Sequence, residues 1–178
     1  MDGKKVLMVV APENFRDEEF TVPRDYFESG GASVAVASTR KGMCRGVMGT
    51  RVEATLSLAE VSASDFDGVV FVGGPGTPAV RRDLDAMRIA KEFSASGKVV
   101  SAICWAPTIL AKAGVLRGKK ATVWNGEDPE MGMSTGDYLE KMGAHYTGEG
   151  VAVDGKVVTA DGPRNAKRFA EEVARALG

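Results

Sequence analysis

The chain has 178 residues, of which 44% are hydrophobic and 26% are charged, and its formal net charge is −1. This near-neutral balance gives no electrostatic reason to expect nucleic acid or an anionic membrane as a partner. The length is typical of one domain, so we expect residues 1–178 to form a single domain. The N-terminus leads directly into an apolar stretch that is too short to span a bilayer and has no cleavage signal after it. A cytoplasmic location is therefore expected.

Apolar runs of strand length alternate with helical patterns in the first part of the chain. Residues 5–10 and 33–38 are such runs, typical of strands that are buried on both faces of a sheet. Between them, residues 17–29 predict a helix that ends at a pair of glycines. Residues 40–55 carry three glycines and predict a loop-rich section with a small hairpin.

The remainder of the chain repeats this alternation. The predicted elements are strands at 66–72, 98–103 and 121–123, helices at 84–96 and 106–113, a helical turn at 138–141, a hairpin at 151–159 and a helix from Pro163 to Leu177. Strand–helix alternation predicts an α/β fold with a mainly parallel sheet and helices on both faces. Ligands bind beyond the carboxyl ends of such strands. We expect residues 11–20, the Gly73-Gly74 turn and the turn at Cys104 to meet there.

The two cysteines, Cys44 and Cys104, are too few for a secreted disulfide scaffold or a zinc site. Both are interpreted as reduced thiols of a cytosolic protein. One histidine cannot complete the usual metal-ligand set, so no metal is expected, and no cofactor is predicted either. Cys44 lies in a glycine-rich loop and is interpreted as incidental, and an exposed thiol there is one alternative.

Cys104 lies between a strand that ends at Ile103 and a helix that starts near Ala106. At that position the free N–H groups and the dipole of the helix stabilise a thiolate. The sequence therefore predicts a thiol pKa below the ordinary ~8.5 and a nucleophilic or oxidisable sulfur. The alternative is an inert thiol that packs as a small hydrophobe.

Two further motifs favour the reactive interpretation. The backbone N–H of Gly74, which follows a buried strand, can form an oxyanion hole beside Cys104 together with the N–H of Trp105; the alternative is an ordinary tight turn. Asp17 and Glu18 are interpreted as solvated charges that complement a helix dipole, whereas Glu19 can point inward to the strand ends.

A separate pair of charges, Arg81 and Arg82, follows the glycine-rich turn. We interpret both arginines as solvated surface charge, with the binding of an anionic group as the alternative.

The chain resembles the DJ-1/PfpI superfamily, also called the ThiJ/PfpI or intracellular protease I group, over nearly its whole length. The matching stretches are residues 14–23, 66–74, 102–107, 113–122, 153–159 and 162–163. The resemblance implies a flavodoxin-like three-layer sandwich with a nucleophile elbow, assembled as a homodimer or larger homo-oligomer. It also implies that Cys104 is the reactive cysteine, that Glu19 hydrogen-bonds the sulfur in its protonated form, and that Gly74 and Trp105 supply the backbone donors of the oxyanion site.

The sequence departs from the protease-like branch of this family at the elbow. That branch has a histidine immediately after the cysteine, where this chain has Trp105. Trp124 stands where some relatives carry a histidine or tyrosine, and Trp124 and Gly73 are expected to line the pocket. No carboxylate follows the Gly-Gly turn, so a Cys-His-Glu triad is not expected. The only histidine is His145, and its approach to Cys104 is an open alternative.

The sequence is compatible with three functions. In the first, the Cys104 thiolate adds to small carbonyl electrophiles such as methylglyoxal or the adducts that it leaves on proteins, in a glyoxalase-like or deglycase-like reaction. In the second, the chain is an intracellular cysteine peptidase or amide hydrolase with peptide substrates, which the missing histidine disfavours. In the third, the chain is no enzyme but a thiol redox sensor or a stress-response chaperone.

Overall fold

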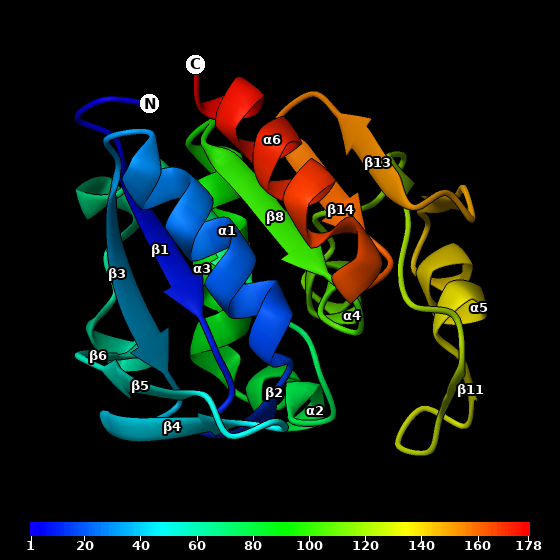
Figure 1. Cartoon of the computed structure of the whole chain (residues 1–178). Helices are drawn as coiled ribbons and strands as arrows, with labels where there is room; N and C mark the ends of the chain where they lie inside the picture. The colour runs from blue at the N-terminus through cyan, green and yellow to red at the C-terminus, as the bar shows by residue number, and fades with distance from the viewer.

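The computed structural model describes residues 1–178 and has a seven-stranded sheet in the order β13-β14-β8-β7-β1-β3-β6 (Figure 1). These strands are β1 (Lys5–Val9), β3 (Ser33–Ser38), β6 (Leu56–Ser57), β7 (Gly68–Phe71), β8 (Val99–Ile103), β13 (Val151–Asp154) and β14 (Val157–Ala160). Every neighbouring pair is parallel except β13 and β14, which form the predicted hairpin at one edge. The predicted α/β fold with a mainly parallel sheet is confirmed.

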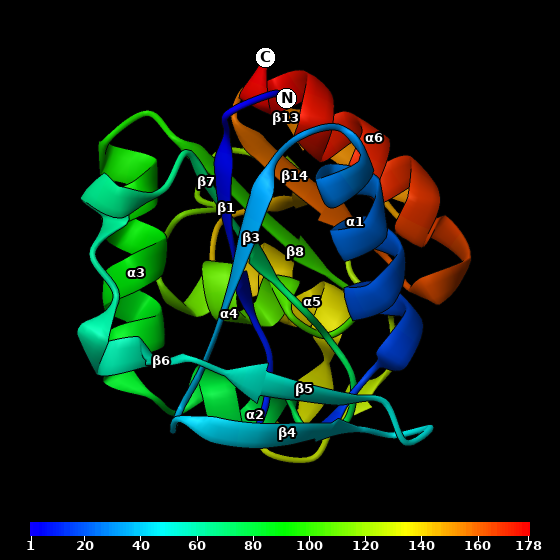
Figure 2. The ribbon, with the colours of Figure 1, turned by 60° about the vertical axis from the view of Figure 1, so that its left-hand side comes forward.

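Helices cover both faces of the sheet. The pair α1 (Asp17–Ser29) and α6 (Ala166–Leu177) packs on one face, and α3 (Leu84–Ala95) and α4 (Pro107–Lys112) pack on the other (Figures 1 and 2). Alternation along β1 produces this sandwich, because successive strand side chains point to opposite faces. Val6 and Met8 belong to the core beneath α1 and α6, whereas Leu7 and Val9 belong to the other core.

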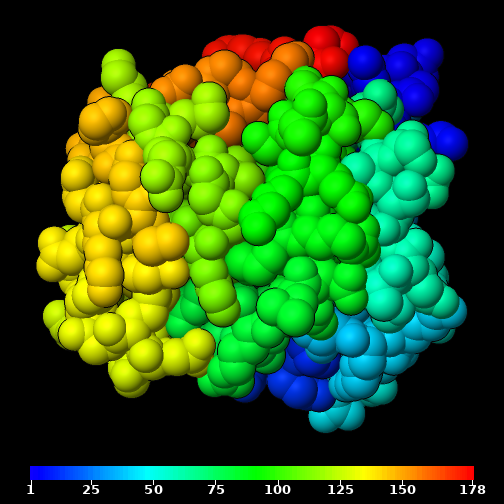
Figure 3. All heavy atoms as spheres, turned by 180° about the vertical axis from the view of Figure 1, so that it is seen from behind, coloured from blue at the N-terminus to red at the C-terminus, as the bar shows by residue number.

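Shorter elements complete the fold. They are α2 (Thr77–Arg81) and α5 (Thr135–Lys141), the three-stranded sheet of β2 (Glu13–Phe15), β4 (Gly42–Gly46) and β5 (Arg51–Ala54), the pair β9 (Lys120–Ala121) with β12 (His145–Tyr146), the pair β10 (Glu127–Asp128) with β11 (Met133–Ser134), and 3₁₀ turns at Leu58–Glu60, Ala63–Asp65 and Pro163–Asn165. Seen from behind, the part of the chain around α5 lies beside the parts around α3 and α4 (Figure 3).

Most predicted bounds agree with the structure, and the differences have local causes. Both ends of α1 and β3 fall where the sequence predicts them. The helical turn expected at 138–141 is longer, because the hydroxyl of Ser134 accepts a hydrogen bond from the N–H of Asp137 and so caps a helix that begins at Thr135. The helix α2 was not predicted, although Pro78 near its start is a favourable helix-opening residue.

Asp17, which the sequence predicts to be solvated, is buried, and so is Cys44, for which an exposed thiol was the alternative. Asp17 does not face solvent, because its carboxylate accepts hydrogen bonds of 2.8 Å from the backbone N–H groups of Met48 and Thr50. It therefore ties the start of α1 to the β4–β5 hairpin. Cys44 is buried on β4, so the alternative of an exposed thiol there is wrong. No helix of the structure has both the length and the apolar character needed to cross a membrane.

Candidate active site

A pocket of about 420 Å³ lies beyond the carboxyl ends of β7 and β8. It is lined by Arg16 and Glu19 at the start of α1, by Gly74 and Pro75 after β7, by Cys104 and Trp105 after β8, and by Trp124 and Pro163 from later segments. The three segments that the sequence predicted to meet at this end of the sheet therefore contribute to one pocket. Gly73, which was also expected to line the pocket, does not line it.

The backbone at Cys104 has a φ of +64°, a left-handed conformation that non-glycine residues adopt infrequently. Hydrogen bonds of 2.8 Å hold it on both sides: the N–H of Cys104 donates to the carbonyl of Ala160, and the N–H of Trp124 donates to the carbonyl of Cys104. Such strain persists where the surroundings over-determine the geometry, and it is concentrated at functional sites. This conformation is that of a nucleophile elbow between a strand and a helix.

Two backbone N–H groups favour the thiolate form of Cys104. They belong to Trp105 and Gly74, and both lower the pKa of the thiol. Gly74 has a φ of +112°, and a Cβ atom there would lie 2.5 Å from the backbone nitrogen of Arg16. Only glycine fits this position, so the direction of the Gly74 N–H depends on the missing side chain.

Glu19 is completely buried beside Cys104, as the inward-pointing prediction requires. Its Oε2 accepts a hydrogen bond of 3.1 Å from the N–H of Gly73, and its Oε1 is buried without a partner. A Cβ atom on Gly73 would lie 2.7 Å from both Glu19 Oε2 and the Cβ of Cys104. The absence of a side chain at Gly73 is therefore what allows the carboxyl group and the cysteine to meet.

Burial raises the pKa of Glu19 from its ordinary value of 4.5 to about 8, so the carboxyl group is mainly protonated at neutral pH. Burial also raises the pKa of the Cys104 thiol, and a charged Glu19 beside the sulfur raises it further. The N–H groups of Trp105 and Gly74 act in the opposite direction. The expected net lowering of the thiol pKa is thus wrong, because burial outweighs the donors at the turn. Protonation of Glu19 removes its repulsion of a thiolate and makes it a potential donor.

A buried ion pair supports the other side of the elbow. The indole Nε1 of Trp105 donates a hydrogen bond of 2.8 Å to Asp128 Oδ2, and the Nη1 of Arg81 donates to the same oxygen at 2.8 Å. Arg81 is 2% exposed and Asp128 is 1% exposed. The interpretation of Arg81 as solvated charge is therefore wrong, whereas Arg82 is exposed and pairs with Glu130.

The two tryptophans form one wall of the pocket. Their ring centroids are 5.5 Å apart and the planes are tilted by 47°. The Trp124 ring lies against Gly126, where a Cβ atom would be 2.2 Å from the ring, so a small residue is required beneath the indole. Because the indole N–H of Trp105 is hydrogen-bonded to Asp128, the Trp105 side chain presents mainly the apolar surface of its ring to the pocket.

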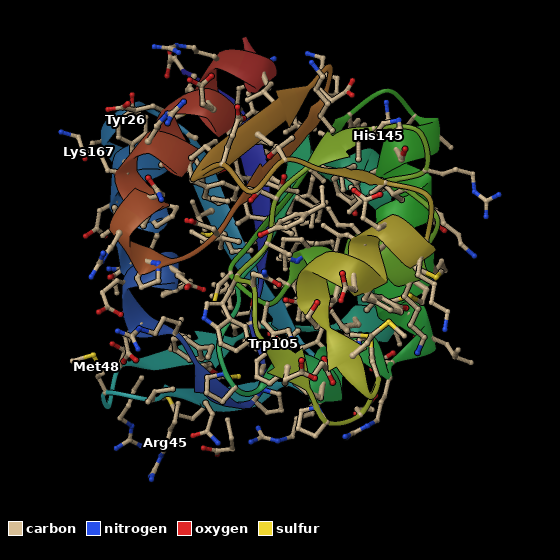
Figure 4. All side chains as sticks on the ribbon, turned by 90° about the vertical axis from the view of Figure 1, so that its right-hand side faces the viewer. Tyr26, Arg45, Met48, Trp105, His145 and Lys167 are labelled. Atoms are coloured by element: carbon tan, nitrogen blue, oxygen red, sulfur yellow. The ribbon has the colours of Figure 1, made fainter.

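His145 is distant from this site. It lies on β12 in register with Lys120, does not line the pocket, and is well separated from Trp105 (Figure 4). Asp128, Arg16 and Pro163 were not predicted from the sequence as neighbours of the elbow. No sequence motif around Asp128 indicates a role at the elbow, because its hydrogen-bond partners come from distant parts of the chain.

Comparison with known proteins gives consistent matches over nearly the whole chain. The DJ-1/PfpI family model matches residues 4–176. The uncharacterized protein MJ0967 of Methanocaldococcus jannaschii is 42% identical over 178 residues, which cover 99% of this chain and 84% of that protein. The deglycase PfpI of Pyrococcus furiosus is 32% identical over 173 residues, covering 97% and 99%. The crystal structure of a ThiJ/PfpI domain protein from Brachyspira murdochii superposes with a TM-score of 0.90 at 32% identity, covering 99% and 98%.

Proposed function

Because the chain belongs to the DJ-1/PfpI family, we propose that it is a cysteine-dependent enzyme whose Cys104 thiolate adds to small carbonyl electrophiles, in a glyoxalase-like or deglycase-like reaction. One observation carries this proposal: the buried Glu19 carboxyl group lies beside Cys104 and has one oxygen, Oε1, with no hydrogen-bond partner. A neutral acid at this position is suited to move protons at a carbonyl carbon. The relative named a deglycase supports the substrate class.

The first step with an α-oxoaldehyde is addition of the Cys104 sulfur to the aldehyde carbon. The S–C bond forms as the C=O π pair moves onto oxygen, and the proton of neutral Glu19 converts the oxyanion into the hydroxyl of a hemithioacetal, which leaves Glu19 as the carboxylate. The backbone N–H groups of Gly74 and Trp105 are the donors available to that oxyanion. With a glycated amine, the sulfur displaces the amine from the hemiaminal carbon, and the amine leaves with a proton to give the same hemithioacetal.

The second step needs one group that both accepts and returns a proton. Glu19, now the carboxylate, removes the hydrogen from the former aldehyde carbon. The C–H electron pair forms a C=C bond to the neighbouring ketone carbon, and the ketone π pair moves onto its oxygen, which takes the proton of the first hydroxyl group. The protonated acid then returns the hydrogen to that second carbon as the C=O bond of the first carbon re-forms, which leaves a thioester on Cys104 and a secondary alcohol. Water cleaves the thioester to a 2-hydroxy acid and restores the thiol, so the balance is one oxoaldehyde and one water for one hydroxy acid.

The test is turnover of methylglyoxal and of its lysine adduct, followed by the 2-hydroxy acid formed. Cys104→Ala is expected to abolish turnover, because no second thiol lies in the pocket. Glu19→Gln is expected to reduce kcat/KM by roughly 10²- to 10⁴-fold, the usual contribution of a positioned acid or base. Cys44→Ala, which removes the only other thiol of the chain, is the matched control and should retain activity. Turnover by Cys104→Ala would contradict the proposal.

Peptide cleavage is not expected from this site. A peptide carbonyl needs more activation than an α-oxoaldehyde, and the pocket contains no histidine to assist Cys104. Incubation of the wild-type protein with casein and short amide substrates should therefore release no fragments above the Cys104→Ala background. Efficient cleavage that depends on Cys104 would favour the peptidase instead.

Thiol oxidation is a second candidate function, favoured by the difference between the two cysteines. Cys104 is partly accessible in its pocket, whereas Cys44 is buried. Peroxide would transfer one oxygen to the Cys104 thiolate and leave as water, giving a sulfenate, and a second equivalent would give a sulfinate. After mild peroxide treatment, mass spectrometry should find one or two added oxygens on the Cys104 peptide and none on the Cys44 peptide. Equal oxidation of both peptides would exclude selective sensing.

A further inference from the structure

A second hollow of about 340 Å³ adjoins the Cys104 pocket. The two share Trp124 and Pro163, which line both. The other lining residues of the second hollow come from the segment between β14 and α6, including Asp161, Arg164 and Asn165. That segment follows the carboxyl end of β14, beside β8 and its elbow (Figure 1). A ligand attached at Cys104 can therefore extend past Trp124 into the second hollow.

The second hollow carries one charge of each sign. Asp161 is half-buried, and its Oδ1 accepts a hydrogen bond of 2.7 Å from the side-chain amide of Asn165. Arg164 is exposed, and neither Arg164 nor Asp161 forms a salt bridge within the chain. Both charges are thus free to pair with groups of a ligand, and their opposite signs select a ligand that carries both charges.

The backbone of the segment that carries these side chains is fixed by hydrogen bonds. The N–H of Asp161 donates to the carbonyl of Gly150, and the N–H of Asn165 donates to the carbonyl of Gly162, each at 3.0 Å. The Asn165 side chain additionally holds the Asp161 carboxylate in place. A preorganised acceptor loses less conformational entropy on binding than a mobile surface charge does.

We propose that this second hollow is a subsite for the zwitterionic α-amino-acid head group of a free lysine that is glycated on its side chain. The α-ammonium faces Asp161, the α-carboxylate faces Arg164, and the methylene chain crosses the apolar surface of Trp124 and Pro163. The modified nitrogen then lies in the Cys104 pocket. The reaction at Cys104 rests on the proposed function, whereas binding of the head group does not. A lysine within a protein lacks these two charges, so the subsite favours free amino acids.

The binding test uses calorimetry with the Cys104→Ala protein, which excludes covalent chemistry. Two probes are compared: Nε-acetyl-lysine, which has the head group, and N-hexylacetamide, which has the same amide on a chain without charges. Nε-acetyl-lysine is expected to bind at least about tenfold more tightly, because each charge-assisted hydrogen bond corresponds to about that factor or more. Asp161→Asn and Arg164→Gln should each reduce its affinity about tenfold.

Matched variants and a kinetic measurement complete the test. Asp161→Asn keeps an acceptor for Asn165 and removes only the charge. Arg168→Gln removes an exposed arginine of α6 that lies outside the hollow, and should leave the affinity unchanged. In the wild-type background, Asp161→Asn should raise KM for the free lysine adduct about tenfold more than KM for methylglyoxal.

Equal affinity of the two probes, or an unchanged affinity in both Asp161→Asn and Arg164→Gln, would overturn the subsite. These results are separable from failure of the proposed function. Charge-dependent binding of Nε-acetyl-lysine by a protein that turns over no carbonyl substrate would retain the subsite and reject the reaction. Turnover of carbonyl substrates with no preference for the charged head group would retain the reaction and reject the subsite.

Discussion

Two buried carboxyl groups contact the Cys104–Trp105 turn, and they differ in charge. Burial by itself raises the pKa of each. For Asp128, hydrogen bonds from Arg81 and Trp105 and the charge of Arg81 outweigh burial and lower the pKa, so the group is ionised. For Glu19, burial is the largest influence, and the Cys104 side chain, the N–H of Gly73 and the charge of Arg16 do not compensate for it, so the pKa rises to about 8.

The comparison teaches that the number of donors and the counter-charge, together with the depth of burial, decide the ionisation state of a carboxyl group with almost no solvent exposure. Asp128 is 1% exposed and Glu19 is 0% exposed. Both oxygens of Asp128 are occupied, because Oδ1 also accepts hydrogen bonds from the N–H groups of Glu130 and Met131. Glu19 keeps one oxygen without a partner. A satisfied carboxylate is suited to hold structure, whereas an unsatisfied acid retains a proton that it can transfer.

The largest expected effect comes from breaking the ion pair. Asp128→Ala leaves the buried Arg81 guanidinium with only the more distant Glu130 carboxylate, at 3.6 Å, as counter-charge, which is expected to reduce the free energy of unfolding by about 3 kcal/mol. Urea denaturation measures this loss. The double variant Arg81→Met, Asp128→Leu removes both charges and should lose clearly less. A loss below about 1 kcal/mol in Asp128→Ala would mean that this carboxylate is not a structural anchor.

A smaller effect is expected from separating Glu19 and Cys104. In Gly73→Ala the new methyl group would lie 2.4 Å from the carbonyl oxygen of Ile103 and 2.7 Å from Glu19 Oε2. Overpacking of this kind costs about 1–3 kcal/mol, and the displaced carboxyl group should reduce the reactivity of Cys104. Thermal unfolding and the rate of thiol alkylation measure the two consequences. Gly162→Ala, where a Cβ atom meets nothing within 4 Å, serves as the control for stability. Equal stability of the two variants would argue against close packing at Gly73.

A third effect is a pH dependence of stability that has opposite signs for the two carboxyl groups. The pKa of Glu19 is higher in the folded protein, so its stabilising contribution is complete below 4.5 and is lost as the pH rises to about 8. The slope is at most ~1.4 kcal/mol per pH unit, the value for one proton. Asp128, with a lowered pKa, instead loses its contribution as the pH falls.

Glu19→Gln isolates the contribution of Glu19, because glutamine does not titrate. Urea denaturation of both proteins between pH 4.5 and pH 8 should find that the variant becomes more stable relative to the wild type as the pH rises. Parallel stability curves over this range would mean that Glu19 is ionised in the folded protein.

The sequence alone determined the framework of this molecule. The apolar runs and glycine stops predicted α1 and β3 to the residue, and the strand-to-helix junction predicted the turn at Cys104. The inward direction of the Glu19 side chain could also be predicted from the sequence, because it depends on a local helical pattern next to Phe20. These features depend on interactions between residues that are close in the chain.

Only the tertiary structure decided the charge states and the partners around the elbow. Arg81 was interpreted as solvated, yet it is buried because Asp128, from a distant segment, supplies its counter-charge. The thiol pKa was expected to fall, yet burial among β8, α1 and the Gly73 turn raises it. Desolvation and ion pairing depend on which distant segments fold against each other, and local sequence patterns do not contain that information.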